Sequence, residues 1–153
     1  LADIAKWWSE NISKDWLDIR SQTYGILQRE DTLKEIVKLL GPEALPDEEK
    51  LILEVARMIK IGILQQNSFD DVDTYCSPEK QFKLMKLQVD FYNQGQQALK
   101  DGASLADIRS MDVISLLLKA RMDVKDDEMN KLDKLSTDMV EQFKTITGIK
   151  VQN

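Results

Sequence analysis

Histidine is absent from this sequence, and cysteine is represented only by Cys76. Without histidine the chain lacks the usual acid/base group near neutral pH, the Ser-His and Cys-His catalytic pairs, and metal sites built on imidazole. A lone cysteine cannot form a disulfide within the chain, which favours a reducing, cytoplasmic compartment. We therefore predict no catalytic residue and no metal ligand in this chain.

Glycine is sparse as well, and the six glycines are placed so that neither GxxxxGK[ST] nor GxGxxG occurs. The chain has no loop of its own to hold the phosphates of a nucleotide. Its 21 basic residues are scattered among 27 acidic ones, so no basic stripe is available for nucleic-acid phosphates. The longest aliphatic run, residues 113–118, is far shorter than the roughly 20 residues of a membrane-spanning helix. We predict neither a nucleic-acid partner nor membrane insertion.

Helical periodicity dominates what is present, because apolar residues recur three and four positions apart and proline is rare. The pattern predicts an all-α helical bundle with a protruding antiparallel helix-turn-helix. In the last predicted helix the apolar stripe consists of Leu132, Leu135, Met139, Phe143 and Ile146. We expect a first long helix from about Asp15 to a stop at Gly41-Pro42 and a second from Asp47 to about Gln66. A third should run from Pro78 to Lys100, before Gly102, and a short helix should follow with Ser104 as its cap. The last should run from about Asp126 to a stop at Gly148.

The sequence begins with Leu1, and its first methionine is Met58. No cationic or apolar leader precedes that methionine. We expect residues 1–153 to form a single helical domain that is part of a longer protein.

Residues 41–50, GPEALPDEEK, lie between the first two long predicted helices. The segment should project from one end of the bundle as a compact acidic tip. It is either a solvated turn or a surface that meets a basic partner. Its acids are Glu43, Asp47, Glu48 and Glu49, placed around the apolar Ala44 and Leu45.

Residues 64–76, LQQNSFDDVDTYC, follow the end of the second predicted helix, and Phe69, Val72 and Tyr75 recur there every three residues. Two aromatics around an aliphatic residue could hold a planar base, at about 1–3 kcal/mol for a stacking contact. The alternative is that they anchor the loop in the core. Adjacent acids such as Asp70 and Asp71, or Asp126 and Asp127, are interpreted as solvated charges.

Four stretches together resemble a known family: WWSENISKDW, ILQREDTLKEIVKLLGPEALP, LILEVARMI and LQQNSFDDVDTYC. In this order they are similar to the C-terminal domain of the catalytic A subunit (alpha chain) of archaeal-type and vacuolar-type rotary ATPases. The match is dense from Trp7 to about Gln81 and looser afterwards. A more distant similarity is to the β subunit of bacterial and mitochondrial ATP synthases, in which an acidic helix-turn-helix loop meets the rotor.

The resemblance implies roles for both segments. Residues 41–50 would be the loop that contacts the central stalk, and residues 64–76 would close over the adenine of a bound nucleotide. A connecting helix, residues 1–10, would lead from a nucleotide-binding domain. The implied rotor contacts are Glu43, Leu45, Asp47, Glu48 and Glu49, and the implied adenine-pocket residues are Phe69, Val72, Tyr75 and Gln66, the last at the base edge.

For the parent enzyme, the resemblance implies binding of ATP or ADP with Mg²⁺ and coupling of ATP hydrolysis or synthesis to proton or sodium transport. The partners would be the central stalk (rotor), the B subunit and the remainder of the catalytic polypeptide. The assembly would be cytoplasmic and peripheral to the membrane. The chain alone would be inactive, since it lacks the phosphate loop. The alternative hypothesis is a stand-alone helical adaptor that docks a basic partner through its acidic tip.

Overall fold

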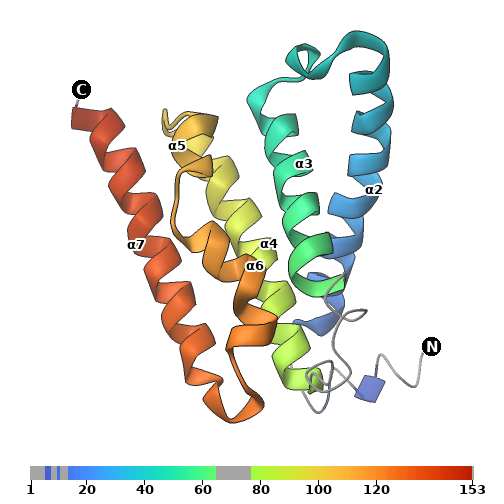
Figure 1. Cartoon of the computed structure of the whole chain (residues 1–153), viewed down its shortest axis with the longest axis vertical. Coiled ribbons are helices and arrows are strands. Elements are labelled where there is room, and N and C mark those ends of the chain that lie inside the picture. The colour runs from blue at the N-terminus through green and yellow to red at the C-terminus, as the bar shows by residue number, and fades with distance from the viewer. Residues whose placement is uncertain (1–5, 8–9, 11–13, 65–76, 153) are drawn as a thin grey trace.

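The computed structural model describes residues 6–7, 10, 14–64 and 77–152, with side chains up to residue 148. In these ranges all regular structure is helical, which confirms the predicted all-α class. Helices α2 (Trp16–Leu40) and α3 (Asp47–Ile59) form an antiparallel pair on one side of α4 (Pro78–Lys100). Helices α6 (Val113–Asp123) and α7 (Asn130–Gln152) cover the other side, with the short α5 (Leu105–Arg109) at one end (Figure 1). No described helix is both long enough and apolar enough to span a bilayer.

An apolar stripe along α3 forms the centre of the core. Leu51 and Val55 are completely buried, and Leu33 of α2 is buried to the same extent in the same cluster. Burial of this kind contributes about 25 cal/mol for each Å² of apolar surface removed from water. The α2–α3 pair is therefore held by packing. The stripe residues, all of them buried, are Ile52, Val55, Ala56 and Ile59, followed by Ile63 in the turn after α3.

The predicted ends of α4 are confirmed. The Ser77 hydroxyl accepts a hydrogen bond from the Lys80 backbone N–H at 3.2 Å, with Pro78 at the first helical position. At the other end Gly102 adopts φ +102°, and the backbone N–H of Ala103 donates to the carbonyl of Ala98 at 3.0 Å. This is a Schellman ending, for which glycine is the preferred residue.

Ser104 caps α5 as predicted. Its hydroxyl accepts from the backbone N–H of Asp107 at 3.0 Å, and the Asp107 carboxylate accepts from the backbone N–H of Ser104 at 3.1 Å. This reciprocal capping box stabilises a helix that would be marginal by length alone.

The predictions for the C-terminal part of the chain are wrong in three respects: one helix is missing, and both ends of the last helix are misplaced. Helix α6 has no counterpart among the predicted helices, because its aliphatic run shows little polar alternation. The last helix begins at Asn130, after a separate 3-10 turn, Asp126–Glu128. It passes through Gly148 to Gln152, since a glycine inside a helix costs only about 1 kcal/mol and does not by itself end it.

Two further predicted helices, the second long helix and the connecting helix, extend into residues outside the described ranges. Helix α3 ends at Ile59 and continues as a π-helical turn, Lys60–Leu64, rather than as α-helix toward Gln66, which is outside the described residues. Of the expected connecting helix, residues 1–10, only residues 6–7 and 10 are described, and they are helical. The remaining residues of that segment lie outside the description.

Two glycines, one within α2 and one at its end, offer a matched stability test. A Cβ at either Gly41 or Gly25 would meet no atom within 4 Å, but Gly41 has φ 86° and ψ 161°, a region that is essentially restricted to glycine. We predict that Gly41→Ala lowers the free energy of unfolding by about 1–3 kcal/mol. Gly25→Ala, within the helix, should raise it by about 0.5–1 kcal/mol. Urea unfolding followed by circular dichroism measures both changes. A change of the same sign in both variants would contradict the conclusion that the backbone at Gly41 requires glycine.

Candidate functional site

The turn between α2 and α3 lies at the apex of the antiparallel pair, as predicted (Figure 1). After Gly41 the chain forms a 3-10 turn, Pro42–Ala44, and Pro46 precedes α3. Backbone hydrogen bonds close both ends of the turn, from the Leu45 N–H to the Pro42 carbonyl at 3.3 Å and from the Lys50 N–H to the Pro46 carbonyl at 3.0 Å. Because the two prolines also fix their own φ angles, the apex is a stiff loop.

Leu45 is buried at the base of this loop. Its side chain is 5% exposed and belongs to the hydrophobic core cluster. The family resemblance includes Leu45 among the contacts to a partner, which stays a prediction, and in the structure its side chain anchors the loop to the hairpin. The surface of the apex is formed by its polar neighbours and by the exposed Pro42 and Pro46.

The four acids of the apex fall into two classes. Glu43 pairs with Lys50 at 3.3 Å, and Glu49 pairs with Arg29 of α2 at 3.6 Å. Asp47 and Glu48 are exposed, and no ion pair within the described part of the chain involves either side chain. Both lie in the first turn of α3, where the helix dipole favours negative charge. These two carboxylates are thus available to an external partner.

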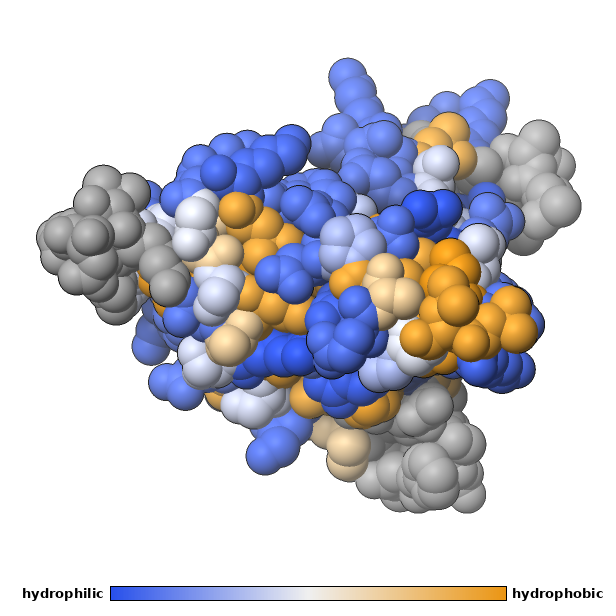
Figure 2. Space-filling view, turned by 90° about the horizontal axis from the view of Figure 1, so that it is seen from above, coloured by the Kyte–Doolittle hydropathy of each residue, from blue (hydrophilic) through white to orange (hydrophobic). Residues whose placement is uncertain are grey.

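An exposed apolar pair adjoins the acids. Leu39 and Leu40, the last residues of α2, are 82% and 73% exposed. They are exposed because the helix ends above the core at this point. Figure 2, which looks down on this end of the molecule, shows hydrophobic surface interrupted by hydrophilic side chains. The sequence pattern alone does not reveal this surface.

A buried carboxylate links the two helices of the hairpin. Glu30 of α2 is 4% exposed, and its carboxylate is held by Lys60 and, at 3.6 Å, by Lys34. The hydrogen bond to Glu30 raises the pKa of Lys60 above its ordinary value of 10.5, although desolvation opposes the shift. The ion pair therefore stabilises the fold fully below pH 10.5, and this contribution is lost as the pH rises through the higher pKa of the folded state.

Removing Lys60 tests this link. We predict that Lys60→Met lowers the free energy of unfolding at pH 7 by about 2 kcal/mol, less than for a fully buried pair because Lys34 remains. The difference from the wild type should shrink above pH 10.5. The control is Lys38→Met, which breaks an exposed pair with Glu35 and should change stability by less than about 1 kcal/mol. Chemical unfolding at several pH values measures both, and equal losses would contradict a special role for Lys60.

The opposite end of α3 meets two buried cations. The Arg121 guanidinium donates to the Ile63 carbonyl at 3.4 Å, and Lys80 donates to the Arg121 carbonyl at 2.7 Å. A Cβ at Gly62 would lie 3.1 Å from the Leu117 carbonyl, so glycine permits the close approach of α6 there. These contacts fix the backbone that leads into residues 65–76. The predicted adenine-pocket residues, Gln66, Phe69, Val72 and Tyr75, lie outside the described residues, so their role stays a prediction.

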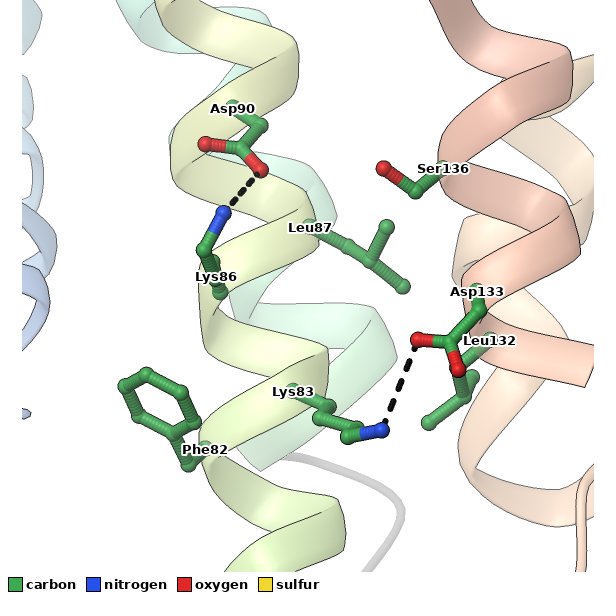
Figure 3. A pocket seen from close by; sticks show the side chains of 8 residues that line it. All are labelled: Phe82, Lys83, Lys86, Leu87, Asp90, Leu132, Asp133 and Ser136. Carbon is green, nitrogen blue, oxygen red and sulfur yellow. Dashed lines mark hydrogen bonds and ion pairs between the residues drawn. The ribbon is translucent and has the colours of Figure 1, made fainter. Parts of the chain in front are cut away.

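A hollow of about 190 Å³ lies between α4 and α7. Figure 3 shows that its charged side chains form two ion pairs, Lys83 with Asp133 at 3.4 Å and Lys86 with Asp90 at 2.9 Å. Ser136 has no histidine to activate it, since the chain contains none. In the part of the chain that is described, no group of three or more acids or cysteines is placed to hold a metal ion.

Comparison with known proteins gives a consistent result. The family model for the C-terminal domain of V and A type ATP synthase matches residues 5–109. The chain is 44% identical over 149 residues to the A subunit of the A-type ATP synthase of Hyperthermus butylicus, a match that covers 96% of this chain and 25% of that protein. It is 42% identical over 146 residues to the corresponding protein of Methanopyrus kandleri, covering 95% of this chain and 25% of that protein.

The similarity extends beyond the archaeal proteins. The V-type ATP synthase alpha chain of Halothermothrix orenii is 36% identical over 143 residues, covering 94% of this chain and 24% of that protein. The chain thus spans about a quarter of the length of the curated relatives that it matches.

Proposed function

This chain belongs to the family of C-terminal domains of V and A type ATP synthases, and from that premise we propose that it serves as the rotor-contacting domain of a catalytic A subunit (alpha chain). In the full-length protein, ATP or ADP with Mg²⁺ binds to a preceding domain, and its hydrolysis or synthesis is coupled to proton or sodium transport. The partners are the central stalk, the B subunit and the remainder of the catalytic polypeptide. The assembly is peripheral to a membrane on its cytoplasmic side.

The observation that carries the rotor assignment is the pair of available carboxylates at the apex. Asp47 and Glu48 project from the first turn of α3, while Leu45 beneath them is buried. Glu49 is paired with Arg29, and Glu43 stays 91% exposed although it pairs with Lys50. A stiff helical pair transmits a push with little bending. Exposed surface charges supply contacts that can slide along a basic partner without one fixed geometry.

Charge reversal at the apex tests this assignment. In the full-length protein within its assembled complex, Asp47→Lys with Glu48→Lys should lower ATP-driven ion transport about ten-fold, because like charges then face the basic partner. Transport and ATP hydrolysis are measured in the same vesicles. The expected outcome is a fall in the number of ions moved per ATP hydrolysed.

The matched control is Asp126→Lys with Asp127→Lys. These two acids are also adjacent and exposed, but they precede α7 at the end of the bundle remote from the apex (Figure 1). The control changes the net charge equally and should leave coupling unchanged. Equal effects of the two double variants would remove the rotor role from Asp47 and Glu48.

We also propose that Phe69, Val72 and Tyr75 form one wall of the adenine pocket, with Gln66 at the base edge. The support comes from the family resemblance and from the stem of the segment. A π-helical turn, Lys60–Leu64, leads into it, and such turns occur frequently at functional sites. The chain alone lacks a phosphate-binding loop, so it is proposed to be inactive without the preceding domain.

Loss of one aromatic ring tests the adenine assignment. In the full-length enzyme, Tyr75→Ala should raise the KM for ATP about ten-fold, since one stacking contact is worth about 1–3 kcal/mol. Tyr24→Ala is the control, because Tyr24 is 52% exposed on α2 and has no part in the proposed pocket. Steady-state ATP hydrolysis gives both values. An unchanged KM for Tyr75→Ala would place Tyr75 outside the pocket.

A further inference from the structure

A groove of about 390 Å³ runs along the outer side of the α2–α3 hairpin. No residue of α4 contributes to it, so it lies apart from the packed interface within the bundle. Its wall is formed by three cations and one acid, and its floor is apolar. The lining residues are Glu30, Lys34 and Val37 of α2, with Leu53 and Arg57 of α3 and Lys60 and Ile61 of the π-helical turn.

Two carboxylates, one buried and one half-buried, organise the charges on this side of the hairpin. Glu30 holds Lys34 and Lys60, and its side chain is only 5% exposed. Glu54, 14% exposed, holds Arg57 at 2.7 Å and Arg109 at 4.0 Å.

The acids therefore lie beneath the cations. The four cationic side chains are between 34% and 53% exposed. Four cations around two carboxylates leave two positive charges in excess, on a chain whose net charge is −6.

The floor of the groove is apolar and partly open. Val37 and Leu53 are half-buried against the core cluster, and Ile61 is half-buried beside them. A second hollow, of about 280 Å³, shares Leu53 and Arg57 with the first. The two hollows therefore continue one another toward the apex. A groove that joins an apolar floor to basic walls fits a partner that is apolar on one face and acidic along its sides.

We propose that this basic groove docks an acidic amphipathic helix of another protein. Two antiparallel helices form a surface on which a third helix packs along the ridges, as α4 does on the inner side of the same pair. The apolar face of the partner covers Val37, Leu53 and Ile61. Its carboxylates pair with Lys34 and Arg57.

The same charges disfavour a nucleic acid. Phosphate recognition requires an extended basic stripe, whereas this face has only a small excess of positive charge on an acidic chain. A phosphate backbone would also leave the apolar side chains of the groove floor uncovered. The groove lies along the side of the hairpin, so its occupant is independent of any contact made by Asp47 and Glu48.

Three synthetic peptides test the proposal by fluorescence anisotropy with the intact chain. The first is a helical peptide with leucines on one face and glutamates along both flanks. The second replaces each glutamate by lysine. The third is a polyglutamate of the same charge without an apolar face. We expect binding of the first peptide that weakens as salt is raised, and binding at least about ten-fold weaker for the other two.

Lys34→Gln with Arg57→Gln tests the site within the chain. Each of the two carboxylates keeps one cation in this variant, Lys60 for Glu30 and Arg109 for Glu54, so the fold should persist, and circular dichroism checks it. Binding of the first peptide should weaken about ten-fold. Lys119→Gln with Lys134→Gln is the control, because these exposed cations lie on α6 and α7 and give the same change in net charge.

Two results would overturn the proposal. Equal weakening in both double variants would mean that the peptide responds to net charge alone. Equal affinity for polyglutamate and for the amphipathic peptide would mean that Val37, Leu53 and Ile61 have no part in binding. Neither result bears on coupling in the assembled enzyme, so the proposal for the apex stands or falls separately.

Discussion

Helix α3 buries one complete face, with Leu51, Val55 and Met58 removed entirely from water between α2 and α4. This burial fixes the direction of the hairpin, because any rotation of α3 would expose the stripe and bring charged side chains into the core. The direction of the hairpin in turn determines the position of the apex, the pairing of Glu30 with Lys60 and the groove on the outer side. The functional surfaces are thus consequences of one packed interface.

Charge is separated on this hairpin by burial. At the apex, Asp47 and Glu48 face outward, while on the side the carboxylate of Glu30 is buried, that of Glu54 is half-buried, and their cations face outward. The same helix pair therefore presents a negative end and a positive flank. The negative end and the positive flank select different partners, because a charged partner that is attracted to one of these surfaces is repelled by the other.

Much of the fold could be predicted from the sequence because local chemistry determines it. Gly102 and Ser104 end and begin helices as their backbone preferences require. Helix α6 escapes prediction because an aliphatic run without regular polar positions has no clear period. Gly148 has the sequence signature of a stop, although packing of α7 outweighs the small cost of one helical glycine. For the site, the division of the apex acids could not be predicted, since the pairs of Glu49 with Arg29 and of Glu43 with Lys50 depend on the folded geometry.

The burial of Leu45 has a consequence for redesign of the loop. Since this one side chain fastens the turn to the hairpin, negative charge can be redistributed among the surrounding positions without altering the shape of the apex. A charge at position 45 would instead have to leave the core, and the turn would lift with it. A redesigned loop could thus be given a new electrostatic partner while its mechanical stiffness is preserved.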